Sequence, residues 1–160
     1  HMRKQNDGLI INISSGAGRF SVPFCSMYSS TKFALEGLIE GVYFELKNLG
    51  IESVLVQPGN FATGLQTKFA TGSIPDVVQS YGEIAQLPNK MAESMVAYFQ
   101  SGQAPDPSLI SKSILKLIET EKGKRPFRTV VDPTPMGVAL EKANKDVEEQ
   151  SKEFIKAFGL

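Results

Sequence analysis

The chain has 160 residues, and its 17 Lys and Arg balance 17 Asp and Glu, so the formal net charge is zero. This length suits one domain, and the 41% share of hydrophobic residues suits a packed core. Balanced charge argues against a nucleic-acid partner, which needs a surface rich in Lys and Arg. The sequence has no apolar run near the roughly 18 residues of a membrane span and no visible signal peptide. We therefore expect a cytoplasmic protein without a membrane partner.

The first two residues, His1 and Met2, are typical of residues left by cloning, and we expect residues 3–160 to form a single domain. Without His1 the chain contains no histidine. This excludes hydrolysis by a Ser-His-Asp triad and zinc sites built on histidine. The one cysteine, Cys25, cannot form an internal disulfide or hold a metal by itself, so we expect no metal site.

The first third of the chain predicts a strand, a loop, a helix and a second strand. Residues 8–14 form a short apolar, β-branched run that is typical of a buried strand, which needs neighbours on both edges. A Gly-rich loop over 15–25 leads into a long helix over about 26–49, and residues 51–57 form the second strand, which ends at a Pro-Gly pair. The apolar positions expected on the buried face of the helix are Phe33, Leu38, Val42, Leu46 and Leu49.

The rest of the chain continues this alternation. Residues 61–103 are irregular, with a clear helix over about 89–100. A further helix starts at the break near 104–108 and ends near 121, a third strand covers 127–132, and a last helix runs from 133 to about 158. Its buried stripe is expected at seven-residue steps, at Leu140, Val147 and Phe154. This order predicts an α/β fold, a partial Rossmann-like parallel sheet of about three strands with flanking helices.

Three chemically active side chains are expected to meet at one edge of this sheet. Ser15 lies just past the end of the first strand, and Tyr28 and Lys32 are four residues apart on one helix face. Ligands of open α/β sheets bind beyond the carboxyl ends of the strands, where the loop 58–63 should also lie. An ammonium group beside a tyrosine favours the phenolate, and a serine hydroxyl can donate to a carbonyl oxygen that gains charge. The trio therefore predicts proton transfer at a carbonyl or alcohol group.

The segments around these residues closely resemble motifs of the short-chain dehydrogenase/reductase family. They are Asn12–Arg19, Pro23, Tyr28–Gly37 and Pro58–Thr63. The resemblance implies that Ser15 polarises the substrate, that Tyr28 is the acid/base, and that Lys32 binds the nicotinamide ribose and tunes the tyrosine. It implies that 62–103 is a substrate lid. The residues it implies for cofactor binding are Tyr28, Lys32, Pro58, Gly59, Phe61 and Thr63.

The resemblance covers nearly all of residues 3–160 but only the C-terminal, catalytic half of the family's fold. The family's Thr-Gly-xxx-Gly-x-Gly phosphate turn, its charged cofactor selector and the asparagine upstream of the serine are absent from the sequence. We therefore expect a truncated chain that is inactive alone and binds NAD or NADP weakly or not at all. The parent protein would interconvert an alcohol and a ketone or aldehyde. The choice between NAD and NADP and the identity of this small-molecule substrate stay open.

Two alternatives come from other functional classes. The chain could be a non-enzymatic interaction module, because a strand that lacks one neighbour and a helix that lacks its packing partner leave apolar surface exposed. On either reading we expect a homo-oligomer, formed through the long helix or through the strand edge at Leu9–Ile13. A serine hydrolase built on Ser15 would lack both a histidine base and a Gly-x-Ser-x-Gly elbow.

The sequence offers a second candidate both for the serine and for the tyrosine of the site. Ser14 could replace Ser15 as the donor, although the spacing to the tyrosine favours Ser15. Tyr43 and Lys47 repeat the Tyr-xxx-Lys spacing, with Ser30 thirteen residues earlier. This second match begins 15 residues further along the helix, about 22 Å from the first at 1.5 Å per residue, and away from the strand ends. We therefore interpret Tyr43 as a structural residue.

Overall fold

The computed structural model describes residues 1–65 and 74–159. The chain divides into two compact units, one of His1–Gly59 with Ser108–Leu160 and one of Asn60–Pro107. The second unit nearly coincides with the segment 62–103 that the sequence predicts as a lid. That role and the single-domain organisation both stay predictions.

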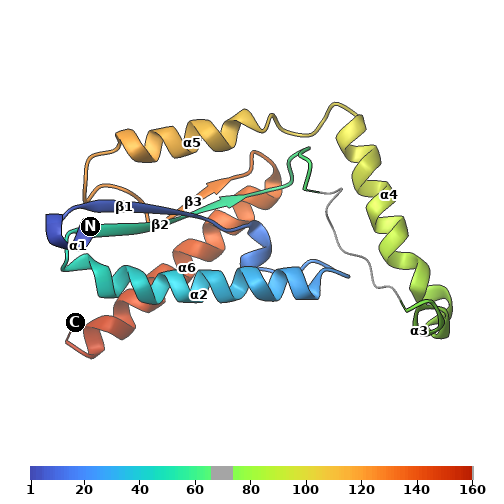
Figure 1. Cartoon of the computed structure of the whole chain (residues 1–160), viewed down its shortest axis with the longest axis horizontal. Coiled ribbons are helices and arrows are strands. Elements are labelled where there is room, and N and C mark those ends of the chain that lie inside the picture. The colour runs from blue at the N-terminus through green and yellow to red at the C-terminus, as the bar shows by residue number, and fades with distance from the viewer. Residues whose placement is uncertain (66–73, 160) are drawn as a thin grey trace. The chain divides into compact units, whose positions relative to one another are not determined.

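The first unit contains the sheet. Strands β1 (Gly8–Ile13), β2 (Ile51–Pro58) and β3 (Arg128–Val131) pair in parallel in the order β1-β2-β3. Helix α5 covers one face of this sheet, and α2 and α6 cover the other (Figure 1). The helices of this unit are α1 (Met2–Gln5), the 3-10 helix η1 (Gly16–Gly18), α2 (Ser26–Lys47), α5 (Ser108–Glu119) and α6 (Pro135–Ala157). This arrangement confirms the predicted α/β fold with a three-stranded parallel sheet.

The core is centred on β2. Val54, Leu55 and Val56 are almost completely buried because β2 has a neighbour on each edge and helices on each face. In contrast, β1 pairs only with β2 among the described residues, and it is half-buried, with Ile13 44% exposed. The prediction of a buried first strand was therefore wrong about burial. An apolar run reports the character of its side chains, whereas burial depends on what lies against them.

The buried face of α2 also differs from the predicted one. Ser29, Glu36 and Ile39 point inward and are buried, whereas Phe33 and Leu38 are exposed. A glutamate can take an inner position here because Arg128 and Gln57 satisfy its carboxylate. Hydrophobic periodicity cannot detect such a position.

The predicted stripe of α6 is only partly correct. Leu140 is buried and Val147 is half-buried, but Phe154 is 66% exposed and contacts Phe158 with ring centroids 4.8 Å apart. A seven-residue repeat drifts by about 20° per step around a straight helix, so its third member has left the buried side. Gly137 and Asn144 complete that side instead.

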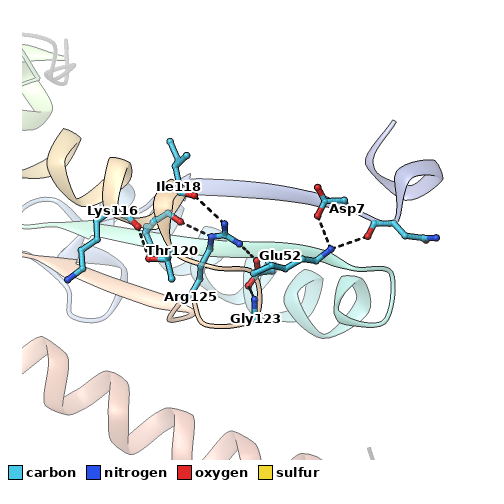
Figure 2. A network of polar contacts seen from close by, with 10 residues as sticks. Asp7, Glu52, Lys116, Ile118, Thr120, Gly123 and Arg125 are labelled. Atoms are coloured by element: carbon cyan, nitrogen blue, oxygen red, sulfur yellow. Dashed lines mark hydrogen bonds and ion pairs between the residues drawn. The ribbon is translucent and has the colours of Figure 1, made fainter.

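A charged network closes the end of the sheet where the strands begin (Figure 2). Arg125 forms an ion pair with Glu52, and the Gly123 N–H donates to the same carboxylate over 3.0 Å. Lys122 Nζ lies 2.8 Å from Asp7 Oδ1, and this hydrogen bond and charge hold the pKa of Asp7 below its ordinary value. These contacts connect Asp7, just before β1, and Glu52, the second residue of β2, to the loop that precedes β3.

The second unit is helical among its described residues. It contains α3 (Pro75–Ser80), the 3-10 helix η3 (Gly82–Gln86) and α4 (Leu87–Gln100), so the helix expected over 89–100 begins two residues earlier. Residues 66–73 of the predicted lid lie outside the described residues. Of the helices that the structure describes, none is sufficiently long and apolar to span a bilayer.

Candidate functional site

Lys32 connects the first turns of α2 to the end of β1. Its ammonium donates a hydrogen bond to the Ile13 carbonyl over 3.1 Å, and Ile13 is the last residue of β1. The same Nζ lies 5.8 Å from the centroid of the Tyr28 ring, within the range of a cation–π contact. The structure thus brings Lys32 both to Tyr28 and to the strand end that leads into Ser15. The catalytic roles of these residues stay predictions.

The two serines after β1 have different environments. Ser15 precedes the 3-10 helix η1 as its N-cap, is half-buried, and accepts a hydrogen bond from the Ala17 N–H over 3.1 Å. Ser14 is buried, and its hydroxyl has no hydrogen-bond partner among the described residues. The more accessible hydroxyl is therefore that of Ser15, the residue that the spacing favours.

The loop that carries Ser15 lies directly on α2 at Gly18. A side-chain carbon at Gly18 would stand 2.9 Å from Glu36 Cγ, 3.0 Å from Ser14 Oγ and 3.1 Å from the Lys32 carbonyl oxygen. These separations are shorter than ordinary van der Waals contacts. A glycine at this position therefore lets the loop after β1 approach the helix that carries Tyr28 and Lys32.

The entry into α2 contains a feature that the sequence did not signal. Phe24 adopts a left-handed φ of 59°, which is rare for a bulky side chain and costs about 1–3 kcal/mol. The Val22 N–H donates to the buried Ser29 hydroxyl over 3.2 Å and helps to hold this turn. Phe24 itself is exposed, one residue before the Cys25 N-cap of α2.

The predicted cofactor-binding loop begins at the carboxyl end of β2. Pro58 is the last residue of β2, and the Gly59 N–H donates to the Val131 carbonyl at the end of β3 over 2.9 Å. Any side chain at Gly59 would collide with the Asp132 carboxylate, so the turn depends on glycine. In the second unit Phe61 is buried, and Thr63 is exposed and accepts from the Leu65 N–H over 3.4 Å. Whether the predicted cofactor-binding residues act together stays a prediction.

Tyr43, the second tyrosine with a lysine four residues later, packs against aromatic rings. Its ring centroid lies 4.6 Å from that of Phe127 and 5.3 Å from that of Phe44. Both contacts use the ring rather than the hydroxyl. They agree with the structural interpretation of this residue.

A buried charged cluster lies beneath α2, and its residues were not predicted from the sequence. We call Arg128 and its three carboxylate neighbours, Glu36, Glu40 and Glu148, the Arg128 cluster. Arg128 Nε is 2.9 Å from Glu36, its Nη2 is 2.9 Å from Glu40, and its Nη1 is 3.8 Å from Glu148. An arginine that opens a short apolar strand is the signal that could have revealed it, because a charge in a buried strand requires partners.

The charges of the Arg128 cluster also act on Arg19, which directly follows η1. Burial is the main cause that lowers its pKa, and the positive charge of Arg128 lowers it further. The three carboxylates of the Arg128 cluster oppose this shift.

Comparison with known proteins gives concordant results. The model of the short chain dehydrogenase family matches residues 1–73. A 3-ketodihydrosphingosine reductase of Bacteroides thetaiotaomicron is 32% identical over 133 residues, which are 83% of this chain and 47% of that protein. An uncharacterized oxidoreductase of Schizosaccharomyces pombe is 28% identical over 127 residues, 79% of this chain and 50% of that protein. The chain therefore spans about half the length of these relatives.

Solved structures show the same fold. A short-chain dehydrogenase from Streptomyces avermitilis matches with a TM-score of 0.57 and 30% identity, over 98% of this chain and 53% of that one. A short chain dehydrogenase/reductase from Burkholderia phymatum, solved with NAD, matches with a TM-score of 0.61 and 21% identity, over 92% of this chain and 50% of that one. Residues 1–73, which include β1, α2 and β2, are thus similar to the short-chain dehydrogenase family.

Proposed function

We propose that this chain contributes the catalytic centre of an NAD(P)-dependent oxidoreductase that interconverts an alcohol and a ketone or aldehyde. The observation that carries the proposal is the placement of Lys32, whose ammonium contacts the Tyr28 ring and the carbonyl that ends β1. Ser15 provides a hydrogen-bond donor, Tyr28 a proton carrier and Lys32 a positive charge. The match of residues 1–73 to the short chain dehydrogenase model supports this assignment, and so does a similar protein named as a 3-ketodihydrosphingosine reductase.

In the direction of reduction, the Tyr28 hydroxyl gives its proton to the carbonyl oxygen of the substrate. The Ser15 hydroxyl donates a hydrogen bond to the same oxygen and stabilises the charge that it gains. The Lys32 ammonium stabilises the phenolate that remains on Tyr28. The reverse reaction uses the same groups, with the phenolate accepting the proton of the alcohol.

The residues at the site fit one end of a nicotinamide cofactor. The Lys32 ammonium and the Tyr28 hydroxyl are suitable partners for ribose hydroxyls. We propose that Pro58, Gly59, Phe61 and Thr63 border the nicotinamide. When bound, this group supplies or accepts the hydride. Solved relatives hold NAD in one case and NADP in another, so both stay open.

We further propose that the diphosphate end is held by a segment that this sequence does not contain, because the sequence has no Thr-Gly-xxx-Gly-x-Gly turn. On this proposal the chain alone is inactive, and it binds NADH and NADPH weakly or not at all. We also propose that the protein is cytoplasmic.

Calorimetric titration with NADH and NADPH tests this division of labour. The comparison is between the present chain and a protein extended by the in-frame DNA upstream of the Arg3 codon. We expect the extended protein to bind one nucleotide at least about 100-fold more tightly, the contribution of two charge-assisted hydrogen bonds to phosphate. A tight nucleotide complex of the present chain alone would contradict the proposal. So would a native stop codon in frame upstream of Arg3.

We also propose that the chain forms homo-oligomers through α2 or through the edge of β1. Phe33 and Leu38 on α2 and Ile13 on β1 are exposed, and β1 has β2 as its one strand neighbour among the described residues. Exposed apolar side chains and open strand edges favour association. Sedimentation at micromolar concentration should show a dimer or a larger assembly, and Leu38→Glu should weaken it if α2 forms the contact. A clean monomer of the unmodified chain would count against this proposal.

A further inference from the structure

Glu36 joins three elements of the first unit through a single buried carboxylate. The residue is 2% exposed and lies on α2. One of its oxygens accepts from Arg128 Nε on β3 over 2.9 Å, and the other accepts from Gln57 Nε2 on β2 over 2.9 Å. Two donors from neighbouring strands therefore converge on the two oxygens of one side chain.

Gln57 extends this connection to the end of the sheet and to α6. It is completely buried and directly precedes Pro58. Its side-chain oxygen accepts from Asn144 Nδ2 on α6 over 2.7 Å. Gln57 therefore connects the end of β2 to both α2 and α6, directly before the predicted cofactor-binding turn.

Glu36 shares its helix face with the predicted catalytic residues. Tyr28, Lys32 and Glu36 are spaced four residues apart, so they lie in one row along α2. Lys32 attaches this row to the end of β1 through the Ile13 carbonyl, and Glu36 attaches it to the end of β2 through Gln57. Two attachments along one row restrict both the rotation of the helix and its sliding along the sheet.

We propose that Glu36 is a positioning residue, which holds α2 so that Lys32 and Tyr28 stay in place beside the end of β1. The site that it serves is the one assigned under the proposed function, whereas the positional effect is a property of this chain. Burying a carboxylate is costly unless donors satisfy it. Apolar packing alone could cover β2, but it would not define the position of α2 with the directionality of two hydrogen bonds.

The variant Glu36→Gln tests this role, with Glu40→Gln as a matched control. A glutamine offers one acceptor and one donor, so at position 36 it can accept from Arg128, but it can bond to Gln57 only if the Gln57 amide turns over and gives up the bond from Asn144 that the structure shows. At position 40 the partners are Arg128 Nη2 and the Ser151 hydroxyl. A hydroxyl can accept as well as donate, so Glu40→Gln can keep both bonds. Both variants remove one carboxylate from the Arg128 cluster. Only Glu36→Gln removes a contact that attaches the row of Tyr28, Lys32 and Glu36 to β2.

The measurement is hydrogen exchange of the Lys32 ammonium by NMR on the isotopically labelled chain, with the signal assigned through Lys32→Met. In the structure this ammonium donates to the Ile13 carbonyl, and we expect that bond to slow its exchange. We expect Glu36→Gln to accelerate its exchange about fivefold, the effect of losing one hydrogen bond, and Glu40→Gln to leave it unchanged. Stability is measured in parallel, because a purely structural role would lower it in both variants without separating their exchange rates.

If Glu36→Gln does not fold, Gln57→Met keeps the pair between Glu36 and Arg128 and removes the attachment of Glu36 to β2, together with the hydrogen bond from Asn144. It should give the same acceleration. Equal exchange rates in a folded position-36 or position-57 variant and in the Glu40→Gln control would overturn the inference. Neither cofactor nor turnover enters this measurement, so its outcome is independent of whether Tyr28 is catalytic.

Discussion

Tyr28→Phe is expected to lower the rate of NAD(P)H-dependent carbonyl reduction by about 10²- to 10⁴-fold, the usual contribution of a general acid or base. The substitution removes one hydroxyl and keeps the ring that the Lys32 ammonium contacts. The loss should therefore appear in kcat rather than in the affinity for substrate. The assay follows oxidation of the reduced nucleotide at 340 nm by the protein extended upstream of Arg3.

Tyr43→Phe is the matched control for this change. It removes the same atom from the second Tyr-xxx-Lys match, whose ring contacts with Phe44 and Phe127 do not need the hydroxyl. We expect its activity to stay within about twofold of the unmodified protein. If the two variants retained equal activity, Tyr28 would not be the proton carrier. Ester hydrolysis that Ser15→Ala abolishes and Tyr28→Phe spares would instead favour the hydrolase alternative.

Arg128→Met is expected to lower the free energy of unfolding of the chain by about 3–5 kcal/mol. The side chains of Arg128 and Glu36 are 1% and 3% exposed, so the variant leaves a buried carboxylate without its counter-charge. Glu40 loses its ion-pair partner at the same time and keeps the Ser151 hydroxyl. Methionine retains most of the aliphatic volume, which limits the contribution of a cavity. The midpoint and slope of urea unfolding give the change directly.

Lys124→Met is the control for the loss of a positive charge. Lys124 pairs with Glu121 over 2.7 Å, but both side chains are about 70% exposed, and such pairs contribute less than about 1 kcal/mol. The double variant Arg128→Met with Glu36→Leu should recover part of the lost stability, because it removes the buried charge together with its partner. If Arg128→Met were no more destabilising than Lys124→Met, the Arg128 cluster would not support the fold as its burial indicates.

The features that could be predicted from the sequence are those that depend on near neighbours in the chain. The three strands begin and end within about one residue of the predicted ranges, since β-branched apolar runs bounded by Gly, Pro and Asp are local signals. Helix geometry alone places Tyr28 and Lys32 on one face of α2. The distance of Tyr43 along the helix also predicted a structural residue, and its ring packs against Phe44 and Phe127.

The composition of the interior could not be predicted in this way. Helix periodicity predicted Phe33 and Leu38 on the buried face of α2. Glu36 is buried there instead, because Arg128, 92 residues away in the sequence, donates to its carboxylate. The open edge of β1 and the exposure of Ile13 likewise depend on which elements lie beside that strand.

The sequence by itself therefore determined the order of strands and helices, their parallel pairing and the residue types at the end of the sheet. These follow from local backbone preference and from the need of parallel strands for helical crossovers. Only the tertiary structure decided that Lys32 reaches Ile13 and that Glu36 receives donors from both β2 and β3. The physical reason is that a buried charge becomes tolerable only when distant partners satisfy it, and the sequence around Glu36 carries no record of those partners.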